Sequence, residues 1–115
     1  MSEHDDRLPM HQMLEHARDA VEMIRGRDRA ELQTNRMLQL ALVHLVQIVG
    51  EAATRVSRAG QAEHPDVAWG QAITTRHRMV HDYDRIDYDV VWDTIVEDFP
   101  PLVAALERAL SGESG

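Results

Sequence analysis

The fold of this 115-residue chain is decided by one stretch, residues 37–56, which reads MLQLALVHLVQIVGEAATRV. Its few polar residues recur at three- and four-residue spacing, which predicts an α-helix with a single polar stripe. The residues on that stripe are His44, Gln47, Glu51, Arg55 and Arg58. A surface helix needs only one apolar stripe, whereas this one is apolar around most of its circumference. We therefore expect it to pack against its own chain and against a second copy. The alternative is a central helix surrounded by its own chain.

The ends of this long helix carry capping signals. Asp28 and Glu31 form the pattern of a capping box, so we expect the helix to begin between Asp28 and Thr34. It should end near Arg58, because Gly60 follows as a helix stop.

A first helix is predicted from about residue 7 to residue 25. Asp6 can cap it, and Pro9 falls in the first turn, where the missing N–H costs little. Gly26 is a plausible stop. The apolar residues that follow three- and four-residue spacing are Met10, Met13, Leu14, Ala17, Val21 and Ile24.

The second half of the chain continues the helical pattern. Residues 61–67 predict a loop, residues 67–82 a third helix, and residues 84–87 a turn. A fourth helix begins at Tyr88 with Asp87 as its cap.

The apolar register of the fourth helix continues across Pro100 and Pro101. Two prolines remove helix hydrogen bonds, so we expect a kink or a short break with the apolar face preserved. The sequence thus predicts an all-α, up-and-down bundle of four helices, or five if the break is complete.

Length and composition bound the class of protein. The length fits a single helical domain over residues 6–110, followed by a disordered tail at residues 111–115. The absence of cysteine excludes disulfides and thiolate zinc sites. Residues 1–6 are polar and acidic, unlike a signal peptide, and the apolar run at residues 37–49 is too short and too polar to span a bilayer. We expect a cytoplasmic protein that does not bind membranes.

Charge argues against loose binding to nucleic acid. The formal net charge is −8, and charge-driven binding needs a basic surface. The charge is uneven, however, because residues 18–78 hold nine Arg against seven acidic residues while residues 82–115 are strongly acidic. A small basic cleft remains compatible with this distribution.

Residues 74–83, TTRHRMVHDY, are the segment most able to perform chemistry. Arg76 offers a planar donor fork for phosphate, His81 can move a proton near neutral pH, and Tyr83 adds a hydroxyl. Arg76 and His81 are about 140° apart on an ideal helix. They can converge if the helix ends between them, or if a cleft between two copies receives both. The alternative is a solvated, charged helix end.

The string Arg76-x-x-x-x-His81-x-Tyr83 resembles the signature of the HepT-like toxins of the HEPN superfamily. The resemblance covers about residues 6–110. Three further features are similar to that family: residues 46–53 (VQIVGEAA), Pro65 followed by Trp69, and residues 86–88 leading to Trp92. One position departs from the family, because asparagine commonly follows the motif arginine and His77 stands here.

The resemblance implies a helical bundle that dimerises through its long second helix and its motif helix, with the motifs of both copies lining a cleft. It also implies a metal-independent ribonuclease without cofactor, in which Arg76 binds the scissile phosphate and His81 transfers a proton. The implied partner is a minimal nucleotidyltransferase that acts as antitoxin and adenylylates Tyr83. The RNA substrate is left open, with transfer RNA as a family-level expectation.

Three alternatives accompany this interpretation. His77 and His81 are four residues apart, a spacing that can bind zinc or nickel on a helix, although Arg78 between them opposes a cation. The same fold could instead be a non-catalytic binding subunit of a nucleotidyltransferase complex. Glu51 could orient Arg76 or His81, or it could pair with Arg55 one turn further along its helix.

Overall fold

The structure is a computed structural model that describes residues 5–82 and 85–112, with the backbone alone at residues 81 and 82. The expectation of an all-α bundle is confirmed, with one short pair of strands added to it. In chain order the elements are α1 (Arg7–Met23), α2 (Arg29–Thr34), α3 (Arg36–Thr54), α4 (Arg58–Glu63), α5 (Trp69–Arg78), β1 (Val80–Asp82), β2 (Arg85–Ile86), α6 (Tyr88–Asp93), a π-helical segment (Thr94–Asp98) and α7 (Phe99–Ser111).

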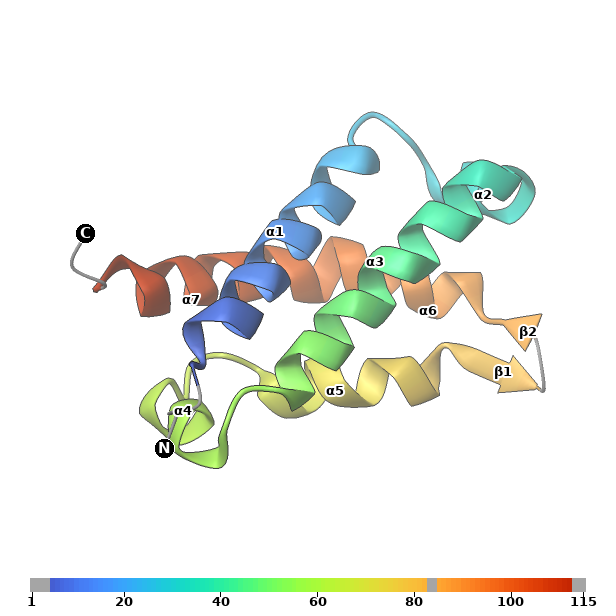
Figure 1. Cartoon of the computed structure of the whole chain (residues 1–115). Helices are drawn as coiled ribbons and strands as arrows, with labels where there is room; N and C mark the ends of the chain where they lie inside the picture. The colour runs from blue at the N-terminus through green and yellow to red at the C-terminus, as the bar shows by residue number, and fades with distance from the viewer. Residues whose placement is uncertain (1–4, 83–84, 113–115) are drawn as a thin grey trace.

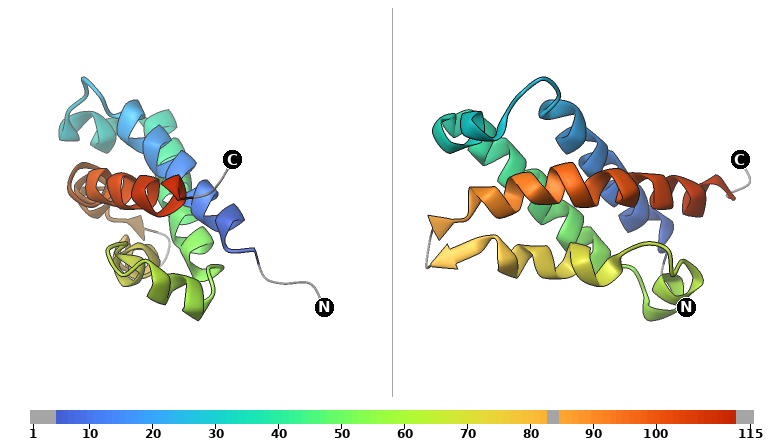
Figure 2. Two further views of the ribbon diagram at one scale, coloured as in Figure 1. Left: turned by 90° about the vertical axis from the view of Figure 1, so that its left-hand side faces the viewer. Right: turned by 180° about the vertical axis from the view of Figure 1, so that it is seen from behind.

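The long helices form two layers that cross obliquely. Helices α1 and α3 make one layer, while α5 and the run from α6 to α7 make the other, as the front and back views show (Figures 1 and 2). Helix α3 packs against α1 and against α5, and α1 also packs against α7. The core lies between the layers, where large side chains such as Met13, Leu42 and Phe99 are almost fully buried.

The predicted long second helix is two helices. Asp28 begins α2 with the expected capping box, in which its carboxylate accepts from the Glu31 amide at 3.0 Å. The chain then leaves helical geometry at Asn35, whose φ and ψ are −95° and 101°. The Asn35 side chain accepts from the Leu38 amide at 3.0 Å and so caps α3. The predicted start was therefore right, but the prediction of one continuous helix was wrong.

Helix α3 is the central element and is buried on more than one side. It has 19 residues, and an 18-residue stretch of it has a mean hydropathy of 1.4, so length and composition alone would allow it to cross a membrane. Half of it is buried inside the protein, which is the pattern of a core helix. Its N-terminal part nevertheless exposes Met37 and Leu40, by 82% and 56%, so the chain itself does not cover the whole helix.

The prediction that Asp6 caps α1 is wrong. Its own φ and ψ of −69° and −19° are helical, and its carboxylate makes no capping bond to α1. The carboxylate instead accepts from the backbone amide and the hydroxyl of Ser57, at 2.8 and 2.6 Å. Ser57 in turn caps α4, a helix that occupies part of the predicted loop at residues 61–67. The start of the chain is therefore fastened to the segment between α3 and α5.

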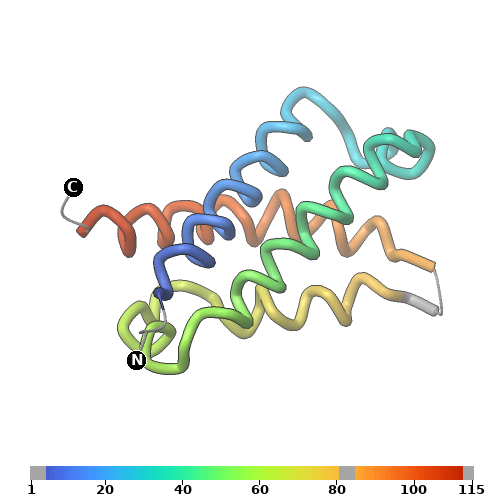
Figure 3. The backbone as a smooth tube through the Cα atoms, viewed as in Figure 1, coloured from blue at the N-terminus to red at the C-terminus, as the bar shows by residue number. Residues whose placement is uncertain are grey.

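The two prolines distort the last helix without breaking it. The backbone continues from α6 through a π-helical segment into α7 (Figure 3), with Pro100 and Pro101 in the first turn of α7. Because proline lacks an N–H, the widened turn before them accommodates the missing hydrogen bonds. The apolar face survives, since Ile95, Phe99 and Leu106 remain buried. The preserved register was predicted, but its π-helical form was not.

The contact between Asp6 and Ser57 can be tested by a substitution at Gly60. A Cβ atom at this position would overlap the Asp6 carboxylate that holds Ser57. We expect Gly60→Ala to lower the free energy of unfolding by about 1–3 kcal/mol, the usual cost of overpacking, measured by urea denaturation. The control is Gly112→Ala, where nothing lies within 4 Å and we expect a change within about 0.5 kcal/mol. Equal stability of the two variants would contradict the packing at Gly60.

Candidate functional site

The motif segment begins as a helix and continues as a strand. Helix α5 ends at Arg78, four residues before the predicted end, and Val80 then pairs with Ile86 across the two short antiparallel strands. The carbonyl of Met79 accepts the backbone N–H of Asp87 at 2.7 Å. This bond joins the residue before β1 to the residue after β2, and the chain leaves helical geometry there. The helix therefore ends between Arg76 and His81, which is one of the two conditions under which they can converge.

The other end of α5 is fixed by Trp69. Its ring is buried, and its indole N–H donates to the carbonyls of Gln61 and His64 at 3.1 and 3.0 Å. Further along the helix, Ala72 and Thr75 are buried, and the Thr75 hydroxyl donates back to the Gln71 carbonyl at 2.6 Å. These contacts hold α5 against the bundle, so that its last turn has a defined position.

Arg76 lies in that last turn, where α5 packs closely against Gly50 of α3. A Cβ atom built on Gly50 of α3 would lie 2.9 Å from Cγ and Cδ of Arg76 and 2.9 Å from the carbonyl oxygen of Ala72. The aliphatic part of Arg76 thus occupies the space that the missing side chain leaves. Arg76 as a whole is exposed, so the stem rests on α3 while the residue remains accessible to solvent.

The last turn of α5 is also unusual in its charge. At least six of the twelve arginines form ion pairs with carboxylates, for example Arg18 with Glu107 and Arg108 with Asp66. Among the side chains that the structure describes, at residues 5–80 and 85–112, none is a hydrogen-bond or ion-pair partner of Arg76, His77 or Arg78. Cationic residues at a helix C-terminus are favoured by the helix dipole. This turn is therefore a cationic surface in a protein whose net charge is −8.

The other predicted site residues are placed with different detail. The backbone of His81 belongs to β1, and Tyr83 lies outside the described residues. His77 is exposed and Glu51 is half-buried on α3, next to Gly50. Glu51 forms no ion pair with any described residue, so the predicted pairing with Arg55 is absent. Arg55 instead donates to the side chain of Gln12 at 2.8 Å.

The alternative of a metal site loses its geometric basis. It required His77 and His81 to share one helical face, but His77 is in α5 and His81 is in β1. In the part of the chain that the structure describes, no three His, Asp or Glu residues are grouped as metal ligands.

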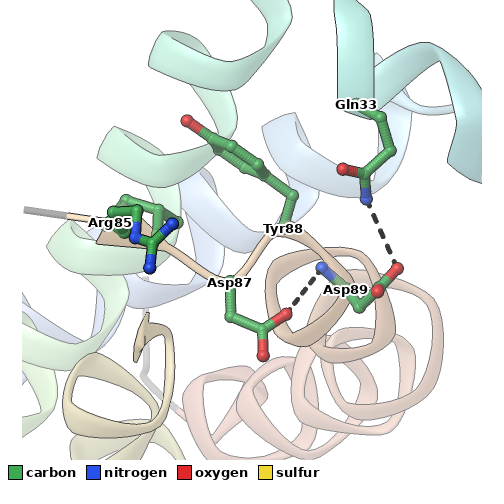
Figure 4. Close-up of a pocket in the computed structure, with 6 residues that line it drawn as sticks. Gln33, Arg85, Asp87, Tyr88 and Asp89 are labelled. Atoms are coloured by element: carbon green, nitrogen blue, oxygen red, sulfur yellow. Dashed lines mark hydrogen bonds between the residues drawn. The ribbon is translucent and has the colours of Figure 1, made fainter. Parts of the chain in front are cut away.

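A hollow of about 340 Å³ lies where β2 meets α6, beside α2 (Figure 4). Its acidic side chains are already engaged. Asp87 accepts from the amides of Asp89 and Val90 at the start of α6, and Asp89 accepts from Gln33 and Arg29. Hydrogen bonds from Arg29 to Asp93 and Asp89 raise the pKa of that arginine above its ordinary value. We interpret these groups as the contact that holds α2 against α6.

Sequence reasoning did not single out Gly50 as part of the site. A signal was available, because a glycine in the middle of a helix costs roughly 0.5–1 kcal/mol relative to alanine and calls for a packing reason. Which neighbour needs the space depends on the crossing of α3 and α5, which the sequence does not reveal.

Comparison with known proteins adds an independent finding. The family model described as "Ribonuclease HepT-like" matches residues 13–109. A protein of Methanocaldococcus jannaschii with the name "Putative RNase MJ1380" is 29% identical over 107 residues, which are 93% of this chain and 98% of that protein. A protein of Thermococcus cleftensis with the name "Probable ribonuclease HepT" is 27% identical over 99 residues, or 83% and 90% of the two chains. The comparison with solved structures gave no match.

Proposed function

This chain belongs to the HepT-like ribonuclease family, and from that premise we propose that it is a metal-independent endoribonuclease that uses Arg76 and His81. One observation carries the proposal. Helix α5 ends between the two residues. Arg76 is accessible and has no partner in the described chain, and the strand that contains His81 begins four residues after it, at Val80. The named relatives, with ribonuclease in their names, support the same reaction class.

The reaction assigns one step to each residue. His81 removes the proton of a ribose 2′-OH, whose oxygen attacks the adjacent phosphorus and forms a 2′,3′-cyclic phosphate. The bond from phosphorus to the 5′-oxygen breaks, and that oxygen takes a proton from a second acid or from water. Arg76 stabilises the charge that develops on the phosphoryl oxygens. No metal ion is needed for any of these steps.

The cationic turn supports an RNA substrate in an otherwise acidic protein. The residues Arg76, His77 and Arg78 are exposed and have no carboxylate partner in the described chain. An RNA phosphate meets uncompensated positive charge there, whereas at least six other arginines form ion pairs with carboxylates. The negative remainder of the surface limits loose binding elsewhere. Binding is therefore directed to the end of α5.

The reaction is proposed to take place in a homodimer. Met37 and Leu40 of α3 are exposed apolar residues on the row that continues through His44 and Gln47, and such a patch favours an isologous contact with a second copy. The second copy would bring a second Arg76 and His81 to the cleft, so that one of them can protonate the leaving oxygen.

Regulation is proposed to act on Tyr83. A partner nucleotidyltransferase would transfer an adenylyl group from ATP to the hydroxyl of Tyr83, with release of pyrophosphate. The added anionic phosphodiester, two residues from His81, would repel RNA phosphate and block the cleft. Toxin and antitoxin would meet in the cytoplasm, where the RNA substrate is found.

The reaction itself is tested with unmodified protein and total transfer RNA in EDTA. We expect the wild type to cut RNA but not DNA and to leave cyclic-phosphate ends. Removal of a proton-transfer group costs about 10²–10⁴ in rate, and loss of a charge stabiliser about 10²–10³, so His81→Ala and Arg76→Ala should both be inactive. Arg76→Ala should unfold within about 1 kcal/mol of the wild type, because its side chain is exposed.

Chelator-sensitive cleavage, or equal cleavage of DNA, would contradict this mechanism. If unmodified wild type binds a nucleotidyltransferase but cuts no RNA, the chain is the non-catalytic subunit instead.

The dimer is tested by a charge on its proposed face. We expect Leu40→Glu to convert a two-chain particle into a single chain, because an unpaired carboxylate cannot be buried in an apolar contact, and to abolish RNA cleavage. Light scattering after size exclusion gives the mass. Leu8→Glu is the matched control, since Leu8 is an exposed leucine of α1, by 66%, and should leave the mass unchanged. A dimer that persists in Leu40→Glu would place the interface elsewhere.

The modification is tested by mass spectrometry after co-expression with a partner nucleotidyltransferase. We expect the wild type to gain one or more adenylyl groups and Tyr83→Phe to gain none, because phenylalanine lacks the acceptor oxygen. Tyr88→Phe is the control for general loss of labelling, since this tyrosine lies in the hollow beside α6. Equal labelling of wild type and Tyr83→Phe would reject Tyr83 as the acceptor.

A further inference from the structure

The crossing of α3 and α5 contains a contact that core packing alone does not explain. Two kinds of atom press on the position where Gly50 would carry a Cβ, each at 2.9 Å. One is the backbone oxygen of Ala72, which belongs to the packing of α5 on α3, and the others are Cγ and Cδ of Arg76. A distance below 3.0 Å is too short for a real Cβ, so a residue with a side chain here requires the Arg76 stem to move and the Ala72 oxygen to shift by a few tenths of an ångström.

Of the two neighbours of Gly50, the Arg76 side chain moves more readily than the Ala72 carbonyl. The Ala72 oxygen is held in the backbone of α5, which Trp69 fixes at one end and the buried Met79 at the other. The Arg76 side chain is exposed and rotates about four bonds, so it gives way more readily than the helix. Without a partner for its guanidinium in the described chain, the contact of its stem with Gly50 is what restricts its direction.

We propose that Gly50 is a positioning residue for Arg76. The aliphatic stem of Arg76 packs against the backbone of α3 at Gly50. This contact fixes the position at which the guanidinium binds the scissile phosphate. This inference rests on the proposed ribonuclease function for its catalytic consequence. Its structural part, the ordering of Arg76 by Gly50, stands apart from any activity.

The kinetic test compares Gly50→Ala with wild type on a fluorogenic RNA. A displacement near 1 Å can cost about 100-fold in rate, so we expect kcat to fall by about 100-fold while KM changes less than threefold. Gly70→Ala is the matched control, because Gly70 lies on α5 and nothing is within 4 Å of its added methyl group. It should keep the wild-type kcat. A smaller folded fraction would also lower the apparent kcat at unchanged KM, so kcat is calculated per folded protein, measured by circular dichroism. A purely structural Gly50 would then give the wild-type kcat in Gly50→Ala.

A second measurement follows Arg76 directly by the NMR signal of its Nε–Hε group, identified by its absence in Arg76→Lys. We expect the signal to report an ordered side chain in the wild type and in Gly70→Ala, and a mobile or shifted one in Gly50→Ala. This readout does not need RNA cleavage.

Stability separates the two neighbours of Gly50. If the added methyl group presses mainly on Arg76, then Arg76→Ala should remove most of the loss of Tm that Gly50→Ala causes, and the double variant should melt close to Arg76→Ala alone. If it presses mainly on the Ala72 carbonyl, the loss of Tm will persist in the double variant, and the proposal is overturned.

The outcomes distinguish this inference from the proposed function. If the wild type is inactive but the Arg76 signal still changes in Gly50→Ala, the ribonuclease function is contradicted, while the ordering of Arg76 by Gly50 is supported. If the wild type is active and Gly50→Ala has the same kcat and the same Arg76 signal, the positioning role of Gly50 is overturned, while the ribonuclease function stands.

Discussion

The structure depends on the burial of α3. This helix is apolar around most of its circumference, and the chain covers it with α1 on one side and α5 on another. Apolar burial is the main favourable term in folding, so the two flanking helices are held mainly by what they cover on α3. The short elements connect the long helices: α2 lies between α1 and α3 of one layer, the strand pair between α5 and α6 of the other, and α4 on the connection from one layer to the other (Figure 1).

Much of this arrangement could be predicted from local sequence. The capping box at Asp28 and the apolar register that crosses Pro100 depend on neighbours within a few residues, and both are present. The features that local sequence could not reveal depend on distant partners. Asp6 bonds to Ser57, 51 residues away, and the end of α5 follows from a bond between Met79 and Asp87 across a turn. A helix pattern continues past Arg78, so only the competing strand explains why the helix stops.

The candidate site shows the same division. Arg76, His77 and Glu51 could be chosen from the sequence as chemically able groups, since guanidinium, imidazole and carboxylate are visible in the letters. The contacts of these residues could not be predicted, because they depend on how α3 and α5 cross. The expected partner of Glu51 was Arg55, one turn away, yet Arg55 bonds to Gln12 of α1. Gly50 has no side chain, so its residue type indicates no chemical role at the site. The proposed role depends on the position of the Arg76 stem, which lies in the space that a side chain would fill.

These observations link the core to the site. A helix that must be covered on several sides brings its neighbours close, and at Gly50 the neighbouring atoms of α5 leave no room for a Cβ. The same approach sets an arginine stem against a rigid backbone, so the position of a cationic group is determined by the packing of the core rather than by a polar network. An ion pair would also hold the arginine, but it would neutralise the charge that the proposed function requires for an RNA phosphate. Apolar support of the stem leaves that charge available, which is why an unpaired arginine can still be a positioned one.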